Sequence, residues 1–208
     1  MGACDEDKFA NDTERPRRLV EIERSFEIGI FPVTAAEWAS FEPDRVLAAN
    51  DLPVVNVSYG DIARYLFWLN ENQTGRPWRL PTEEEWEYAC RAGTETIFNT
   101  GDHLNRSEAN FLFNESIERV GPGGRTVVST YPPNSWGLYD FHGNVSEWTA
   151  SGWRPDLHSE TVSVFGRHTV RGGAWDYLPR LLRSSWRDGL SDSTRRDNLG
   201  FRLARDIR

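Results

Sequence analysis

The chain is poor in several residue types that would mark a specialised class of protein. Only two of its 208 residues are cysteine, which excludes a dense disulfide framework. No apolar run approaches the roughly 20 residues that a membrane-spanning helix needs. The polar, acidic first residues contain no apolar signal core. We therefore expect a cytoplasmic protein with no membrane partner.

Lysine is nearly absent, and positive charge is unevenly distributed. The formal net charge is −8, and the single lysine is Lys8, so nearly every cation is arginine. Such an acidic chain disfavours nucleic-acid binding. Residues 171–208 nevertheless carry nine Arg and five Asp, a local charge of +4 against −12 elsewhere. Arginine suits carbonyl-rich loops and bidentate contacts, and a GC-rich codon bias would explain its excess equally well.

Motifs of common catalytic sites are missing. The four histidines have no metal-ligand spacing, and the sequence contains no P-loop, dinucleotide fingerprint or Gly-x-Ser-x-Gly element. The stretch "GPGG" at 121–124 is a turn signal. We therefore expect no catalytic residues and no catalytic cofactor.

Aromatic residues and turn formers are abundant. Nine Trp and eleven Phe indicate an aromatic-rich core, while 17 Gly and 11 Pro indicate many turns. This combination favours a loop-rich fold over a helical bundle. The length suits one sizeable domain, and no linker or internal repeat divides it.

Three capping boxes precede apolar stretches and predict helices. The boxes are Thr34 with Glu37, Ser58 with Asp61, and Thr82 with Glu85. The first predicts a short helix over about 35–42. The second and third predict helices that end before Gly75 and at Gly93. The third helix also places Cys90 on its inward face, as a buried inert thiol.

Strand signals are weaker and shorter. Residues 19–31 alternate well enough for one or two strands. After Gly93 no further helix is expected, and the remaining strand candidates are 126–130, 144–149, 168–174 and 199–204.

Seven ordered stretches together resemble one family. They are "FPVT..EW" (31–38), "PVVNVSYGDI" (53–62), "RPWRLPTEEEWEYACRAG" (76–93), "ANF" (109–111), "PPNSWGLYDFHGNVSEW" (132–148), "VRGGAW" (170–175) and "NLGFRLA" (198–204). The chain resembles the sulfatase-modifying-factor family, which includes formylglycine-generating enzymes. The resemblance implies one domain over 1–208 with an α+β fold of C-type-lectin type: short twisted antiparallel strands, two main helices and extensive irregular loops.

The resemblance also allows an oxidase to be tested against the sequence. Formylglycine-generating enzymes use a cysteine pair between their "RGGS" and "GFR" motifs to bind copper(I) and oxidise a substrate cysteine. Here that segment contains no cysteine, and Cys4 and Cys90 lie outside it. A serine cannot replace a thiolate as a copper ligand or redox group. The sequence therefore disfavours the oxidase.

A structural calcium ion is a further implication of the resemblance. In the family, one tight turn wraps calcium with side-chain and carbonyl oxygens, the ligands that this ion prefers. The matching residues are Asp140, Gly143, Val145 and Glu147. Alternatively, the two acids pair with arginine or backbone donors and no ion binds. The family's other calcium site lacks an acid in its second half, "ERVGPGGRT".

A second group with this fold consists of variable proteins of diversity-generating retroelements. Their 3′ coding end is rewritten with errors at template adenines, between fixed stretches similar to "RGGSW" and "GFRLA". Here the variable region would be 171–203. The candidate variable, ligand-binding positions are Asp176, Tyr177, Leu178, Leu181, Trp186, Asp188, Gly189, Leu190, Ser191, Thr194, Arg196 and Asp197. All except Trp186 are reachable from an AAC codon by adenine changes.

We therefore expect a non-enzymatic ligand-binding protein that displays residues 176–198 on a rigid scaffold. Tyr177, Trp186 and the leucines are expected to form an exposed patch of anchors for an unidentified protein partner. Three alternatives stay open: an ordinary solvated loop packed on the core, a regulatory or adaptor module without diversification, and the oxidase.

Overall fold

The computed structural model describes residues 1–45, 49–155, 157 and 164–207. In chain order its elements are η1 (Asp12–Glu14), β1 (Phe26–Ile28), α1 (Ala35–Ala39), α2 (Tyr59–Glu71), α3 (Glu83–Arg91), β2 (Ser146–Gly152), β3 (Arg167–Arg171), η2 (Pro179–Leu181), β4 (Arg187–Ser191), β5 (Leu199–Phe201) and β6 (Ala204–Asp206), where η marks a short 3-10 helix. Two main helices, short strands and long irregular loops confirm the expected α+β class.

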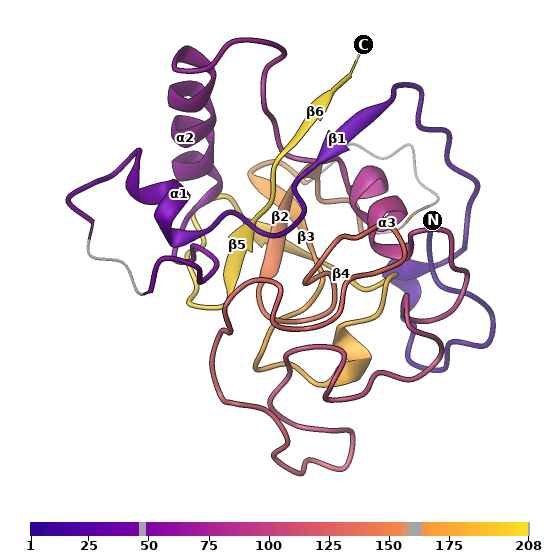
Figure 1. Cartoon of the computed structure of the whole chain (residues 1–208). Helices are drawn as coiled ribbons and strands as arrows, with labels where there is room; N and C mark the ends of the chain where they lie inside the picture. The colour runs from indigo at the N-terminus through magenta and orange to yellow at the C-terminus, as the bar shows by residue number, and fades with distance from the viewer. Residues whose placement is uncertain (46–48, 156, 158–163, 208) are drawn as a thin grey trace.

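The strands form two sheets. The larger sheet has the order β4-β3-β2-β5, and β1 pairs with β6 in a smaller antiparallel one. Figure 1 shows α2 and α3 on opposite sides of the larger sheet, with the loops between α3 and β2 gathered below it. Among the described strands, three of the four pairings are antiparallel, as expected, and the fourth is parallel, between β5 and β2.

All three predicted capping boxes are present. In each, the hydroxyl of the Thr or Ser accepts from the backbone N–H of the third helical residue. The carboxylate of that third residue accepts in turn from the backbone N–H of the Thr or Ser. The first helix is shorter than expected. It ends at Ala39, and just beyond it the Ser40 and Phe41 N–H groups bond to carbonyls three residues back, at 3.3 and 2.9 Å, in a tighter turn.

Two strand expectations need correction. Residues 126–130 are not a strand, because their backbone bonds go elsewhere: the Thr126 N–H bonds to Asn144 Oδ1 at 3.0 Å, and the Val128 N–H to the Asp51 carbonyl at 3.0 Å. Conversely, β4 was not predicted. It has no alternating pattern, since it is largely buried along its length.

The main core lies between α2 and the larger sheet. Its fully buried aromatic residues Trp38, Trp148 and Phe201 come from α1, β2 and β5. Trp38 also stacks on Tyr65 of α2, with ring centroids 5.0 Å apart. The core thus holds both ends of the 171–203 segment, since β3 and β5 belong to the sheet that it supports.

Candidate functional site

The 171–203 segment is fixed from within by Arg171, the last residue of β3. This side chain is fully buried. Its guanidinium donates to the carbonyls of Ser184, Ser185 and Trp186 at 2.9, 2.8 and 2.5 Å. One arginine therefore positions three consecutive peptide units beyond η2, so the backbone is ordered despite the irregular composition.

The twelve candidate variable positions differ in exposure. The exposed ones are Asp176, Ser191, Arg196 and Asp197; the half-buried ones are Tyr177, Leu178, Leu181, Asp188 and Thr194; the buried ones are Trp186, Gly189 and Leu190. Nine of the twelve are thus open at least in part to solvent.

The expected exposed patch of aromatic and leucine anchors is therefore wrong in part. Trp186 and Leu190 are only 6% and 8% exposed and belong to the main core. Leu181 is half-buried and packs against the same core. A Cβ at Gly189 would lie 2.2 Å from the Trp153 ring. Codon reachability says which residues can arise at a position, not which way their side chains point, so the sequence did not reveal this burial.

The remaining positions include a compact surface around one tyrosine, which we call the Tyr177 surface: Asp176, Tyr177, Asp188 and Arg196. Burial raises the pKa of the Tyr177 hydroxyl, with Arg196 opposing this effect and both aspartates adding to it. The Tyr177 ring meets Trp186 edge to face, with centroids 5.7 Å apart. A half-buried tyrosine thus has a fixed ring and charged neighbours of both signs.

The loop that completes this surface is tied to the helical side of the fold. The Asn56 N–H donates to the Arg196 carbonyl at 2.9 Å, and the Tyr59 N–H to the Asp192 carbonyl at 3.1 Å. The Asn198 amide also donates to Asp176 Oδ1 at 2.8 Å. These bonds keep the surface in one conformation, which lowers the entropy cost of binding.

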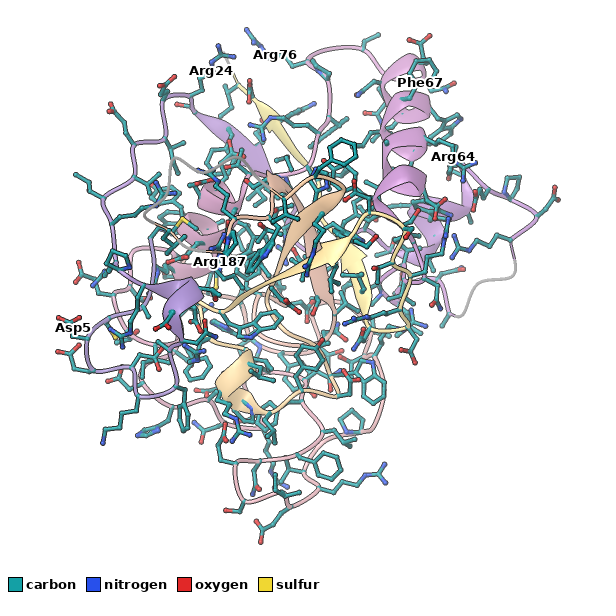
Figure 2. The ribbon with its side chains drawn as sticks, turned by 180° about the vertical axis from the view of Figure 1, so that it is seen from behind. Asp5, Arg24, Arg64, Phe67, Arg76 and Arg187 are labelled. Atoms are coloured by element: carbon teal, nitrogen blue, oxygen red, sulfur yellow. The ribbon has the colours of Figure 1, made fainter. Side chains whose placement is uncertain are left out.

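Buried arginines explain the local positive charge. Arg183 is 1% exposed and binds Glu14 through two nitrogens, at 2.6 and 2.7 Å, as well as Asp7 at 2.5 Å. Arg187, near the middle of the molecule in Figure 2, binds Glu83 in the same two-pronged way. Arginine is thus used here for the bidentate contacts that its geometry allows. The chain start is correspondingly packed against this segment, which its polar sequence did not indicate.

The predicted calcium acids lie in a turn and in β2. Asp140 has a positive φ of 60°, and its Oδ2 accepts from the Ser129 N–H at 2.9 Å. Glu147 is fully buried; its two oxygens accept from Arg202 Nη2 and Nε at 2.7 Å each. Trp86 Nε1 donates to the same carboxylate at 2.7 Å. This arrangement matches the alternative in which the acids pair with arginine and backbone donors.

Gly143 and Val145 serve the same turn as structural residues. Gly143 has a φ of 82°, and a Cβ there would lie 2.2 Å from the Asn110 carbonyl oxygen, so glycine is required. Val145 is fully buried. Both oxygens of Glu147 already accept from the Arg202 guanidinium, which balances the charge of the carboxylate, so Glu147 does not fit a calcium ligand set. Calcium binding stays a prediction from the sequence.

Chelation tests the calcium prediction directly. We expect the Tm to be unchanged when EGTA is added, because the Arg202 guanidinium already occupies the position of a counter-ion to Glu147. The measurement is a thermal melt with EGTA and with excess calcium. A Tm that rises with calcium concentration would show that an ion binds the folded state.

Neither cysteine belongs to the 171–203 segment, and the two differ in exposure. Cys90 is fully buried, and burial raises the pKa of its thiol to about 12. Cys4 is partly exposed, near the chain start. We expect a disulfide reagent such as DTNB to modify Cys4 quickly and Cys90 only after unfolding. The Cys4→Ser variant should be unreactive while folded, and fast labelling of that variant would contradict the burial.

No described helix is long and apolar enough to cross a membrane. Within the same part of the chain, no group of three or more His, Cys, Asp and Glu side chains is placed to hold a metal ion.

Comparison with known proteins establishes the family. The sulfatase-modifying factor enzyme 1-like domain model matches residues 1–207, so the chain belongs to this family. It is 33% identical over 198 residues to mouse formylglycine-generating enzyme, covering 84% of this chain and 50% of the relative. It is 36% identical over 166 residues to mouse inactive C-alpha-formylglycine-generating enzyme 2, covering 74% and 49%. The chain spans about half the length of these curated relatives.

Solved structures confirm the C-type-lectin-type fold. PvdO from Pseudomonas aeruginosa has a TM-score of 0.86 and 28% identity, covering 100% of this chain and 90% of its own. Variable protein 1 of Treponema denticola has a TM-score of 0.70 and 24% identity, covering 87% and 84%. The second likeness concerns the fold alone.

Proposed function

We propose that this chain is a non-enzymatic binding module that recognises a partner protein through the Tyr177 surface. One observation carries the proposal: the half-buried Tyr177 ring is held by Trp186 and surrounded by charges on an ordered backbone. Fixed aromatic rings with polar neighbours are typical anchors of protein interfaces. The local charges would give specificity, and the fixed backbone would limit the entropy lost on binding.

The cysteines support a binding role over oxidation. The oxidase expected from the family needs a thiol pair in the 171–203 segment, which has none. Cys90 cannot substitute, because its thiol is buried and neutral. Relatives of this chain include both a formylglycine-generating enzyme and an inactive one, so family membership allows either role.

Diversification of the surface is the finer part of the proposal. It would be confined to the nine exposed or half-buried candidate positions, because side chains there contribute least to the core. The burial of Trp186, Gly189 and Leu190 favours a second candidate in the same class, an adaptor module with a fixed surface.

The DNA around the gene distinguishes these two candidates. Diversification requires a nearby near-repeat of the DNA encoding 171–203, differing mainly at adenines in the codons of the nine positions, with a reverse-transcriptase gene alongside. If the complete surrounding sequence contains neither, the fixed-surface adaptor holds and diversification is excluded.

Turnover and cross-linking test the binding module itself. We expect no copper(I) binding and no oxygen consumption with a cysteine peptide; turnover would establish the oxidase. A photo-crosslinking residue at Arg196 should capture a discrete protein from an extract of the source cells. The same residue at Arg76, which is exposed near the end of α2, should not. Equal capture at both positions, or none at Arg196, would contradict the proposal.

A further inference from the structure

A cavity of about 490 Å³ lies outside the Tyr177 surface, where four distant parts of the chain meet. These are the chain start, the 97–106 loop, residues 111–120 and η2 with the residues just after it. In Figure 1 the loops after α3 and the short helix η2 lie together in the lower half of the molecule. The volume is within the range of small-molecule sites, about 300–1,000 Å³.

The walls of this cavity are mainly apolar. Phe98 and Phe111 are 4% and 3% exposed and belong to a small core cluster that also includes Leu182. Leu104 and Val120 pack against the same cluster and line the cavity. The cavity floor is therefore built from core side chains that are already packed, which reduces the cost of binding an apolar group.

An aromatic side chain stands at the cavity with much of its surface in water. Phe9 lines the cavity and is 53% exposed. Its N–H is held by Asp7 Oδ1 at 3.0 Å, so its backbone is fixed although its ring is uncovered. A ligand in the cavity would cover this ring and remove apolar surface from water, a favourable contribution to binding.

The charges around the cavity are not balanced. Arg180 is paired with Glu115 at 2.9 Å, and Arg183 with the buried Glu14. By contrast, Lys8 and Arg106 form no ion pair with any residue in the described part of the chain. Asp102 also lines the cavity; its Oδ1 accepts from the Ile97 N–H at 3.3 Å, and it forms no ion pair with a described residue. Two unpaired cations against this one carboxylate, beside an apolar cavity in a chain of net charge −8, favour an anionic ligand.

We propose that this cavity binds a small amphipathic anion: an aromatic or branched apolar body that contacts Phe9, Phe98 and Phe111, with an acidic group facing Lys8 and Arg106. This site goes beyond the proposed partner-binding function and does not depend on it, because neither Tyr177 nor residues 191–197 line the cavity.

Two fluorescent probes that share one ring system separate the apolar and charged contributions. 1-Anilinonaphthalene-8-sulfonate carries an anionic group, and N-phenyl-1-naphthylamine does not. We expect the folded protein to bind the anionic probe more tightly. Phe9→Ala should weaken both probes by about tenfold, since it removes one aromatic wall. Arg106→Glu should weaken the anionic probe by about fivefold and leave the neutral one nearly unchanged.

Matched variants elsewhere on the surface control for nonspecific effects. Phe67 is 71% exposed on α2, and Arg76 is also exposed; both lie in the upper part of the molecule in Figure 2 and do not line the cavity. Phe67→Ala and Arg76→Glu should change the Kd of neither probe, and thermal melts should show every variant folded. The proposal is overturned if Phe9→Ala has no effect, if Arg106→Glu affects both probes equally, or if the controls weaken binding as much.

Discussion

Replacing Arg202 with alanine should lower the free energy of unfolding by about 3–5 kcal/mol. Arg202 and Glu147 are both fully buried, and two guanidinium nitrogens bind the two carboxylate oxygens at 2.7 Å. Without the guanidinium, the Trp86 indole would be the one side-chain donor left to Glu147 among the described residues. Its buried negative charge would lack a counter-ion, and this is the main source of the expected loss.

The same residue also ties three parts of the chain together. Arg202 donates to the carbonyls of Gly29 and Tyr139 at 3.1 and 3.0 Å, and its guanidinium lies 3.7 Å from the centroid of the Phe141 ring. Alanine would leave both carbonyls without this donor and open a cavity beside the ring, which adds to the loss.

Urea unfolding followed by tryptophan fluorescence measures this effect. Arg24→Ala is the matched control, because Arg24 is 71% exposed and its contact with Asp206 is 3.5 Å, so we expect a cost of about 1 kcal/mol or less. Removing both charges, with Arg202→Met and Glu147→Gln, should cost less than Arg202→Ala alone. If Arg202→Ala costs no more than the control, another cation neutralises Glu147, and the calcium prediction regains support.

Local signals explain why the helices could be predicted from the sequence. Each begins at a Thr or Ser whose hydroxyl caps the helix, and the returning acid stands three residues later. Both partners are close in sequence, so the pattern is visible without the fold. The buried face of α2, with Ile62, Tyr65 and Leu69, follows from the same local spacing.

Long-range contacts explain what could not be predicted. Strand β4 has no alternating pattern, because Gly189 and Leu190 are both buried in successive positions. The pairing of Arg183 with Glu14 joins residues 169 positions apart. No spacing in the sequence indicates such a contact, so the polar chain start gave no sign that it packs against the fold.

Long-range contacts also limited what the sequence could predict about the candidate site. The backbone of the segment is ordered, as expected, and nine of the twelve positions are at least partly open to solvent. Which side chains turn inward depends on what covers them. Trp186 is covered by Tyr177 and the core, a contact that the fold alone creates.

Introducing asparagine at Gly189 should lower the free energy of unfolding by about 3 kcal/mol. The Cβ alone would lie 2.2 Å from two atoms of the Trp153 ring, and the rest of the side chain needs further space. Trp153 cannot move easily, because it is 8% exposed and lies under the Arg187 guanidinium, 4.7 Å from the ring centroid. The amide of the new side chain would also be buried at a position that has no hydrogen-bond partner arranged for it.

Gly124 supplies the matched control for this substitution. A Cβ at Gly124 would meet no atom within 4 Å, so Gly124→Asn should change stability by about 0.5 kcal/mol or less. Urea unfolding of both variants, beside Asp176→Asn at an exposed candidate position, gives the comparison. A large loss only at Gly189 would place β4 in the scaffold and limit any diversified surface to the nine open positions. An unchanged Gly189→Asn protein would instead show that β4 can accept new side chains, and the binding surface would then extend across the strand.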